Sequence, residues 1–520
     1  MFDLLIHGGW VIDGTGGPPF RADVGLIDTM IGAVGRLEGV EAPRVLDATG
    51  LYVAPGFIDA HVHGDAMLLA DPVHLPALRQ GVTTYILGQD GSSFAPASPA
   101  TLEYMRRYTA GFNGNPDGVG YDWNSIDEYL RRFDRNVAIN VAYLIPNGNV
   151  RMEVKGLDPG PASADELAAM RRLVREGMEA GAVGLSSGLD YIPSRFADAT
   201  ELAALCEEVA AQDGIYVTHM RGYGAMAPVG MAEVVETARR SGVAAHVSHY
   251  NGAADLLIPL VDSARALGVD LTFDTYPYLA GSTILGMVAL PPWVQEGGID
   301  ATVARLRDPA IRARLNTEWF SKPTPYALDQ ITLAMVADPS RRWAEGWKLT
   351  EAAEKEGRSP GDFVCEVLAD SGMAVGIVGF RPGERTDDDV RAILRHPSHM
   401  AGSDGIYCGG FPHPRGWGAF ARYLGRHTRE LGDYDWASAV THLASHAARR
   451  FRLADRGLVR PGFAADLALF DPATVADRST YAAGRTLAEG VRHVFVNGTL
   501  ALLDGEPTGA TPGRALRRGS

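Results

Sequence analysis

Short runs of apolar residues recur through the middle of the chain, and most are followed by a stretch with helical periodicity. The runs lie at residues 55–63, 81–88, 136–146, 181–188, 214–220, 242–250, 268–277 and 399–405. Several helical stretches between them close on glycine, which commonly caps the C-terminus of a helix. Eight strands that alternate with helices are typical of a parallel barrel. The pattern therefore predicts an α/β fold with a (β/α)8 TIM-type barrel over residues 55–454.

The two ends of the chain have a different pattern. Residues 1–54 and 455–520 contain short apolar stretches broken by Gly, Asp and Pro, which favour small strands joined by turns. Each segment is too short to form a stable sheet by itself. We therefore expect the two segments to pair into one β-sandwich domain built from both termini. Residues 511–520 (TPGRALRRGS) are expected to form a loose tail.

A long interval separates the seventh apolar run from the eighth. It carries charged, helix-like pieces and many prolines, so an inserted subdomain over residues 283–395 is a better interpretation than a structureless loop. Insertions that follow a barrel strand lie on the face of the active site. The segment is therefore a candidate lid, and an insertion without a role in catalysis is the alternative.

Charge and composition argue against several classes of protein. The 520 residues carry a formal net charge of −15, so a basic face for nucleic acid is not expected. No apolar run is long enough for a membrane span, and the N-terminus has no signal-peptide pattern. The three cysteines are too few and scattered for a disulfide framework. These features predict a cytoplasmic enzyme with a small-molecule substrate and no membrane partner, and they leave the oligomeric state open.

The strongest chemical signal is a set of histidines at the ends of the predicted strands. His61 and His63 end the first run, and alternate residues of a strand face the same side. His219 and His249 lie near the ends of the fifth and sixth runs, and Asp404 lies near the end of the eighth. The C-terminal ends of barrel strands meet at one rim, so these side chains predict a metal site there.

This constellation resembles the amidohydrolase superfamily and, within it, the D-aminoacylases, which are N-acyl-D-amino-acid deacylases. The motifs that carry the resemblance are APGFIDAHVH, GVTT followed by GQDGSSFAP, SSGLDYIP, THMRGYG, VSHYNG, DTYPYLAGST, GSDG followed by HPRG, and RGLVRPGFAADLALFDP. They occur in order and cover nearly the whole chain. The resemblance implies a zinc-dependent amidohydrolase that cleaves the linear N-acyl bond of N-acyl-D-amino acids with a metal-activated water.

Within that resemblance, Asp90 stands where the family has a cysteine that binds zinc. We predict that Asp90, His219 and His249 hold the metal, that Asp404 is the general base, and that His61 and His63 bind a second, weaker ion or support the first. The alternative for Asp90 is a local turn in its G-D-G loop. Because a carboxylate is a harder ligand than a thiolate, Mn²⁺ or Co²⁺ would also suit the site.

Lysine is scarce, and this bears on the mechanism. The chain has four lysines, Lys155, Lys322, Lys348 and Lys355, and only the first lies between the His61–His63 pair and His219. A metal bridge made by a carbamylated lysine, which other amidohydrolases use, is therefore disfavoured.

Four residues are predicted to bind substrate by resemblance. Asn251 replaces a lysine that faces the substrate carboxylate in the family, so the chain lacks that positive charge. Arg415, in HPRG, matches the other carboxylate-binding position and would form a bidentate clamp. Tyr191 and Tyr278 are predicted to line the same pocket. Asn147 replaces a histidine of the family pattern HGxxR, with no effect that the sequence reveals.

Three other functions stay open at this point. The first is hydrolysis of a D-residue-containing peptide or an amidated acyl-D-amino acid. A substrate without a free carboxylate would agree with the absence of a lysine at position 251. A cyclic amidase of the hydantoinase or dihydroorotase type is disfavoured by the lysine argument. A catalytically inactive metal-binding scaffold would not need to keep Asp404.

Overall fold

The centre of the molecule is a closed parallel barrel. The computed structural model describes residues 1–322, 327–381 and 383–518. The barrel strands are β6 (Phe57–Asp59), β8 (Val82–Leu87), β9 (Asn140–Pro146), β10 (Gly184–Gly188), β11 (Ile215–His219), β12 (Ala244–Val247), β13 (Leu271–Thr275) and β17 (His399–Ala401), in that spatial order. The amide of Ala60 donates to the carbonyl of Ala401 at 3.1 Å and joins the first strand to the last. The eight predicted strands and the barrel are confirmed.

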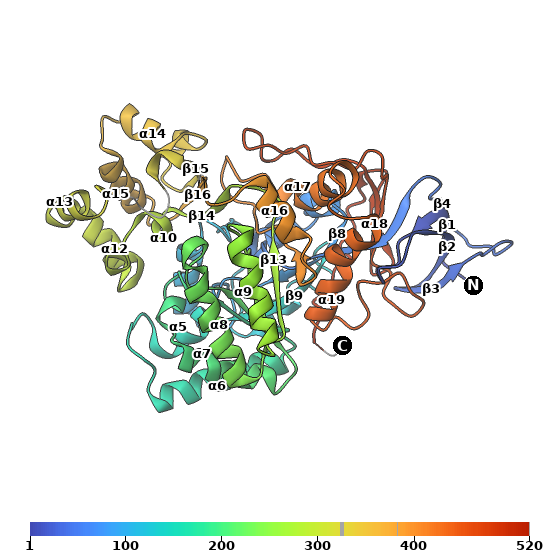
Figure 1. The fold of residues 1–520 in the computed structure, drawn as a ribbon, viewed down its shortest axis with the longest axis horizontal. Coiled ribbons are helices and arrows are strands. Elements are labelled where there is room, and N and C mark those ends of the chain that lie inside the picture. The colour runs from blue at the N-terminus through green and yellow to red at the C-terminus, as the bar shows by residue number, and fades with distance from the viewer. Residues whose placement is uncertain (323–326, 382, 519–520) are drawn as a thin grey trace.

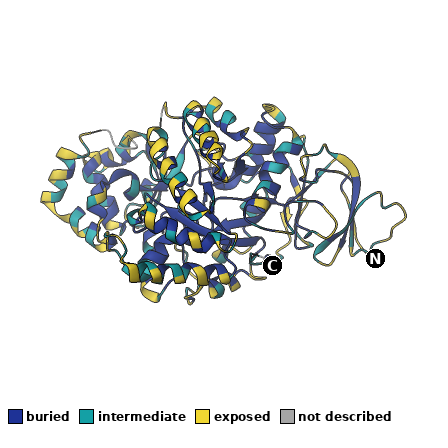
Figure 2. Cartoon of the chain, turned by 60° about the horizontal axis from the view of Figure 1, so that its bottom comes forward, coloured by how far each residue is buried: buried dark blue, intermediate teal, exposed yellow. Residues whose placement is uncertain are grey.

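Burial on both faces explains why the barrel strands are apolar throughout. Every residue of β8 and β9 is buried, as expected for parallel strands that are covered by side chains inside and by helices outside. Figure 2 shows the same division, with buried strands in the interior and exposed residues on the outer faces of the helices. No helix of the described residues is both long enough and apolar enough to cross a bilayer.

A ring of helices covers the barrel (Figure 1). They are α1 (Asp65–Ala70), α2 (Leu75–Leu78), α3 (Pro99–Tyr108), α4 (Ile126–Arg131), α5 (Asn147–Lys155), α6 (Ala164–Glu179), α7 (Ala199–Ala210), α8 (Ala227–Ser241), α9 (Ala254–Ala266), α16 (Asp387–Leu394), α17 (Arg415–Arg422), α18 (Trp436–Val440) and α19 (His446–Arg450). Polar residues start several of them: Ser163 and Glu166 form a capping box at α6. At the other end of a helix, Gly242 closes α8 with a positive φ of 73°.

The two chain ends form one nine-stranded sheet. It contains β1 (Leu4–Val11), β2 (Phe20–Ile27), β3 (Met30–Gly35), β4 (Val45–Asp47), β5 (Tyr52–Pro55), β19 (Leu467–Phe470), β20 (Val491–Val496), β21 (Thr499–Leu503) and β22 (Glu506–Pro507). Strand β5 pairs antiparallel with β19, and Ala54 lies opposite Ala468. That pairing joins the N-terminal strands to the C-terminal ones, as the matching patterns of the two ends predict.

A separate unit lies at the opposite end of the molecule from strands β1–β4 (Figure 1). Its antiparallel sheet consists of β14 (Gly281–Ile284), β16 (Val375–Gly379) and β15 (Ile331–Val336). Its helices are α10 (Leu285–Ala289), α11 (Pro292–Gln295), α12 (Gly298–Arg307), α13 (Pro309–Glu318), α14 (Leu349–Lys355) and α15 (Pro360–Asp370). These elements enclose a hydrophobic core of their own, and we call them the inserted unit.

The inserted unit begins at Gly281, two residues before the predicted segment 283–395, and the larger difference lies at the C-terminal end. Helix α16, inside that segment, packs on the barrel beside α9, and the carboxylate of Asp389 accepts from the amide of Ala254 at 2.8 Å. Residues 323–326 and 382 of the predicted segment lie outside the described residues.

The expectation of a loose C-terminal tail is wrong for residues 511–518, the part of the tail that the structure describes. The amide of Val141 in β9 donates to the carbonyl of Arg514 at 2.9 Å, and the amide of Leu516 donates to the carbonyl of Val141 at 2.7 Å. The tail is ordered because its backbone pairs with β9 at the start of that barrel strand. Residues 519–520 lie outside the described residues.

Candidate functional site

The predicted metal ligands gather at the C-terminal rim of the barrel. His219 is the last residue of β11, and His63 is the last of the short strand β7 (Val62–His63), which pairs with β18 (Gly405–Ile406). Asp90, His249 and Asp404 follow β8, β12 and β17, and each has a positive φ, of 54°, 34° and 51°. Such backbone is unusual for non-glycine residues and marks sites where the surrounding structure imposes a side-chain direction.

Asp90, His219 and His249 converge at distances that suit a single metal ion. Oδ2 of Asp90 lies 3.6 Å from Nδ1 of His219 and 3.6 Å from Nε2 of His249, and the two imidazole nitrogens are 3.0 Å apart. Ligand atoms about 2.0–2.1 Å from a tetrahedral zinc ion lie roughly 3.3 Å from one another. The three side chains therefore match the spacing of a zinc site.

His61, His63 and Asp404 form a second group beside the first. Oδ1 of Asp404 lies 3.2 Å from Nε2 of His63 and 3.7 Å from Nε2 of His61. Asp90 reaches this group as well, since its Oδ1 is 3.7 Å from Nε2 of His61. The described residues thus contain two groups that could hold a metal ion, His61–His63–Asp404 and His61–Asp90–His249, and the two groups share His61.

Unsatisfied polar atoms show that the site fits a cation. Both ring nitrogens of His61 and Oδ1 of Asp90 are buried without a hydrogen-bond partner. Such atoms are costly to bury unless a further group satisfies them. A divalent ion would satisfy them, because neutral imidazole and carboxylate are zinc ligands. This geometry favours the ligand interpretation of Asp90 over a local turn.

The electrostatics of the site also favour positive charge. Burial lowers the pKa of His61, but the carboxylates of Asp90, Asp274 and Asp404 outweigh it and raise that pKa to about 9. Burial raises the pKa of Asp90, but His61 and His249 hold it well below its usual range. The carboxylates that stabilise a protonated imidazole here would stabilise a metal ion in the same way.

Asp274 supports the ligands and was not singled out by the sequence. One carboxylate oxygen accepts from the backbone amide of His249 at 2.9 Å. The other lies 2.9 Å from Nε2 of His246 and 3.6 Å from Nδ1 of His61. A single carboxylate therefore orients two predicted ligands, His61 and His249, and also contacts His246. The position of Asp274 at the end of the seventh run was the available signal.

Replacing Asp274 with asparagine is expected to weaken zinc binding by about 10–100-fold, because carboxylates that orient metal-bound histidines have effects of this size. Asparagine keeps an oxygen for the His249 amide but removes the charge beside His61. The measurement is the zinc Kd from competition with a chelator. Thr272→Val is the matched control, since the hydroxyl of Thr272 lies 2.8 Å from Nδ1 of His246, the ring nitrogen that Asp274 does not contact. Equal affinities of D274N and the wild type would contradict the role.

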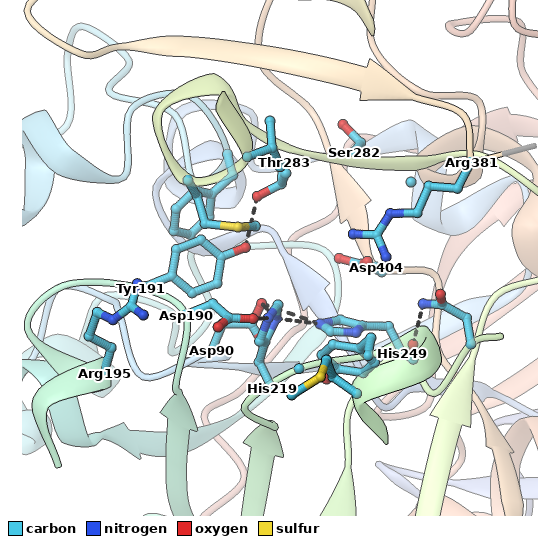
Figure 3. A pocket seen from close by; sticks show the side chains of 18 of the residues that line it. Asp90, Asp190, Tyr191, Arg195, His219, His249, Ser282, Thr283, Arg381 and Asp404 are labelled. Atoms are coloured by element: carbon cyan, nitrogen blue, oxygen red, sulfur yellow. Dashed lines mark hydrogen bonds and ion pairs between the residues drawn. The ribbon is translucent and has the colours of Figure 1, made fainter. Parts of the chain in front are cut away.

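A cavity of about 490 Å³ opens over the ligands. Figure 3 shows Asp90, His219, His249 and Asp404 at its floor, with Tyr191, Ser282 and Thr283 around it. Asp190, which the sequence did not single out, also lines the cavity, and its carboxylate lies 3.2 Å from Nε2 of His219. Asp190 precedes Tyr191 in the motif SSGLDYIP, and this motif was the only feature of the sequence that could have placed Asp190 at the site.

The residues predicted to bind substrate fall into two pairs. Tyr191 and Asn251 line the cavity; the hydroxyl of Tyr191 is 2.8 Å from that of Thr283, and the side-chain amide of Asn251 donates to the carbonyl of His249 at 2.6 Å. Arg415 and Tyr278 lie outside the lining.

Arg415 and Tyr278 are engaged elsewhere. Nη1 of Arg415 lies 2.8 Å from Oδ2 of Asp404, and its other terminal nitrogen donates to the carbonyl of Ser282. Arg415 is thus placed to hold the carboxylate of Asp404. The ring of Tyr278 packs edge-on against His413, and its hydroxyl donates to Asp477 at 3.4 Å. Strand β13 ends at Thr275 and the chain then turns, so Tyr278 is directed away from the cavity. Tyr276 lines the cavity in its place.

Four histidines and two aspartates meet at the C-terminal rim of the closed parallel barrel, and some of their ligand atoms are buried without a hydrogen-bond partner. This arrangement defines a metal-dependent hydrolase site. A model of the amidohydrolase family matches residues 44–501. The chain belongs to this family, and the resemblance to its D-aminoacylase members is confirmed by similarity over the full length.

The similarity to D-aminoacylases extends over both chains. The protein is 34% identical to a D-aminoacylase of Alcaligenes xylosoxydans xylosoxydans over 99% of this chain and 98% of that one. It is 35% identical to an N-acyl-D-glutamate deacylase of the same organism, over 99% and 96%. Its structure superimposes on that of an N-acyl-D-glutamate deacylase from Bordetella bronchiseptica, complexed with zinc and a phosphonate inhibitor, with a TM-score of 0.83, 32% identity and 99% coverage of each chain.

Proposed function

We propose that the protein is a zinc-dependent deacylase that hydrolyses the linear N-acyl bond of N-acyl-D-amino acids. The observation that carries the proposal is the position of Asp404, which lines the cavity, lies 3.2 Å from Nε2 of His63 and is tied to Arg415. The relatives named above act on bonds of this kind.

Zinc is the cofactor in this proposal, and the residues at the rim of the barrel would be its ligands. Asp90, His219 and His249 would hold one zinc ion tightly, and His61 and His63 would bind a second ion more weakly. The bound metal would lower the pKa of a water molecule and polarise the acyl carbonyl. Because Asp90 offers oxygen, Mn²⁺ and Co²⁺ would also be accepted.

Asp404 performs the proton transfers in this proposal. Burial raises its pKa, but Arg415 and the neighbouring histidines outweigh burial and hold it at about 2, so the carboxylate is ionised at neutral pH. It accepts a proton from the water that attacks the acyl carbon. It then donates that proton to the leaving nitrogen as the C–N bond breaks, which releases a carboxylic acid and a D-amino acid.

A substrate panel tests the proposed function. The zinc-loaded protein would be assayed with N-acetyl-D-leucine, N-acetyl-L-leucine, a D-residue dipeptide and a cyclic imide. Turnover of N-acetyl-D-leucine in preference to the other three supports the proposal. Preferential turnover of the cyclic imide would instead support an enzyme of the hydantoinase type, and no turnover of any acyl-D-amino acid would overturn the proposal.

The described lysines argue against the cyclic-amide alternative. None of them lines the cavity. Lys155, the last residue of helix α5, is paired with Asp158 and Glu166. A carbamate bridge between the two ligand sets therefore has no lysine to form it among the described residues. Asp90 occupies the position between the two sets instead.

We also propose that the inserted unit selects substrates. It supplies one apolar wall of the cavity, through Met287, Val288, Leu290, Pro292 and Trp319. Such a wall favours an apolar group, either the side chain of the amino acid or a long acyl chain. This role supports the prediction that the insertion contributes to the active-site face.

Replacing Trp319 with alanine is expected to lower kcat/KM for N-acetyl-D-leucine by about 10-fold and for N-acetyl-D-alanine by less than about 3-fold. The larger loss reflects apolar area that the leucine side chain buries against the indole. If the long acyl chain occupies the wall instead, N-hexanoyl-D-alanine will show the loss.

Trp343→Ala is the matched control for this prediction. Trp343 lies in the same unit, stacks edge-on with Trp347, and does not line the cavity. Equal effects of W319A and W343A on every substrate would show that the wall does not contact the substrate.

A further inference from the structure

The predicted metal-binding histidines differ in what their second ring nitrogen contacts. Nδ1 of His63 lies 3.1 Å from the side-chain oxygen of Asn113, which is a neutral amide. Nε2 of His219 lies 3.2 Å from a carboxylate oxygen of Asp190 (Figure 3). Nδ1 of His219 is left for the metal, since it lies 3.6 Å from Oδ2 of Asp90. A negative charge therefore stands behind the tighter predicted site, and a neutral amide stands behind His63 of the weaker one.

The backbone around Asp190 is anchored next to this histidine. The amide of Leu189, the residue before Asp190, donates to the carbonyl of His219 at 2.9 Å, which ties the loop after β10 to the ligand itself. Farther along the same loop, the carbonyl of Arg195 accepts from the guanidinium of Arg221 at 2.9 Å. The loop is thus held on both sides of Asp190, and this keeps the carboxylate beside the imidazole.

The surroundings of Asp190 favour its ionised form. Burial raises its pKa, but His219, Arg195 and Arg221 outweigh burial and lower that pKa below its ordinary value. An ionised carboxylate can only accept hydrogen bonds, so Nε2 of His219 must carry the proton and Nδ1 must offer its lone pair. A carboxylate partner of this kind also makes the imidazole a stronger metal ligand.

The other carboxylate behind the ligands, Asp274, does not distinguish the two sites. It lies 3.6 Å from Nδ1 of His61 and accepts from the backbone amide of His249, so it contacts a residue of each site. Of the predicted metal ligands, all of which lie in the described part of the chain, Asp190 contacts His219. Its effect should therefore fall on one site.

We propose that Asp190 is a positioning residue for His219 that strengthens the tighter metal site and not the weaker one, and so sets the order in which the two ions bind. This inference rests on the proposed function, because it takes Asp90, His219 and His249 as zinc ligands. It gives a role to a carboxylate that lines the cavity and takes no part in the proton transfers of Asp404.

The test measures the zinc Kd of each ion by competition with a chelator in Asp190→Ala and Asp190→Asn. Alanine removes both the charge and the acceptor, so the Kd of the tighter ion is expected to rise about 10–100-fold. Asparagine keeps an oxygen for Nε2 of His219 without the charge, and its Kd should lie between those of D190A and the wild type. The Kd of the weaker ion is expected to change by less than about 3-fold, because His63 keeps its contact with Asn113.

The visible spectrum of the cobalt-loaded protein gives a readout that does not depend on turnover, because it reports the ligands and geometry of the tighter ion. The spectrum is expected to shift in D190A and to stay unchanged in Asp198→Asn, the matched control. Asp198 follows the same loop and caps α7 by accepting from the amides of Thr200 and Glu201. Asparagine caps a helix about as well as aspartate, so D198N removes one charge and keeps the fold.

Weaker binding of the tighter ion in D190A, with D198N equal to the wild type, supports the inference, and the nearly isosteric D190N decides it if melting curves show that D190A is unfolded. The role of Asp190 is overturned if its variants bind both ions like the wild type or lose both equally, or if D198N shows the same loss. A raised KM with unchanged zinc affinity would make Asp190 a substrate contact and would also overturn it. If the wild type binds zinc but hydrolyses no acyl-D-amino acid, the proposed function fails and this inference stands; if it binds no zinc, both fail.

Discussion

Asp404→Asn is expected to lower kcat by about 10²–10⁴-fold while zinc stays bound, because the variant loses general acid–base catalysis and keeps every predicted ligand of the tighter site. Asparagine has the shape of aspartate but cannot accept the proton of the attacking water. Asp404 lies 3.2 Å from His63 and 2.8 Å from Arg415, so the side chain is held in place from two sides. The expected loss is in kcat, with KM changed little.

The measurement is steady-state kinetics on N-acetyl-D-leucine together with the zinc content of the same preparation. Zinc content separates loss of the base from loss of the metal, and circular dichroism confirms that the variant is folded. Full activity of D404N with normal zinc content would refute the general-base assignment. Loss of zinc together with activity would show that Asp404 acts chiefly as a ligand in the group that it forms with His61 and His63.

Asp90→Ala is expected to abolish tight zinc binding and, with it, to lower kcat/KM by about 10³-fold or more. Catalytic zinc is ordinarily held by three protein ligands, and this substitution leaves only His219 and His249 at the first site. It also removes the carboxylate that faces His61 in the neighbouring group. Metal analysis after dialysis, and activity with and without added zinc, measure both effects.

Asp90→Cys and Asp90→Asn are the matched variants. Cysteine offers a thiolate at the same position and is expected to restore zinc binding, with a stronger preference for zinc over Mn²⁺ than the wild type has. Asparagine keeps the size of aspartate without its charge and is expected to bind zinc weakly. If D90A retains zinc and activity at the level of the wild type, Asp90 is a turn residue and the ligand assignment fails.

The barrel and its rim could be predicted because both depend on local patterns. Each barrel strand is a short apolar run, and the two faces of a strand alternate residue by residue, so His61 and His63 had to point the same way. The C-terminal ends of parallel strands meet at one rim, which brings His219 and His249 together from different parts of the chain. The pairing of the two chain ends followed from their matching strand patterns.

Residues beyond regular strands were placed less well. Tyr278 was expected in the pocket, but β13 ends at Thr275 and the chain then turns, so the tyrosine packs against His413 and Tyr276 faces the cavity. The tail after residue 510 has no apolar pattern, yet its backbone pairs with β9. Backbone pairing leaves little trace in side-chain sequence, and this is why the tail was misjudged.

By itself, the sequence determined the barrel, the family and the chemical types of the residues at the rim. It also disfavoured a carbamate bridge, because only four lysines are present. Only the tertiary structure decided where Arg415 lies: it is buried against Asp404 and stays outside the lining of the cavity. The physical reason is that ion pairing depends on burial and distance between segments far apart in the chain, and neither quantity is encoded in local spacing.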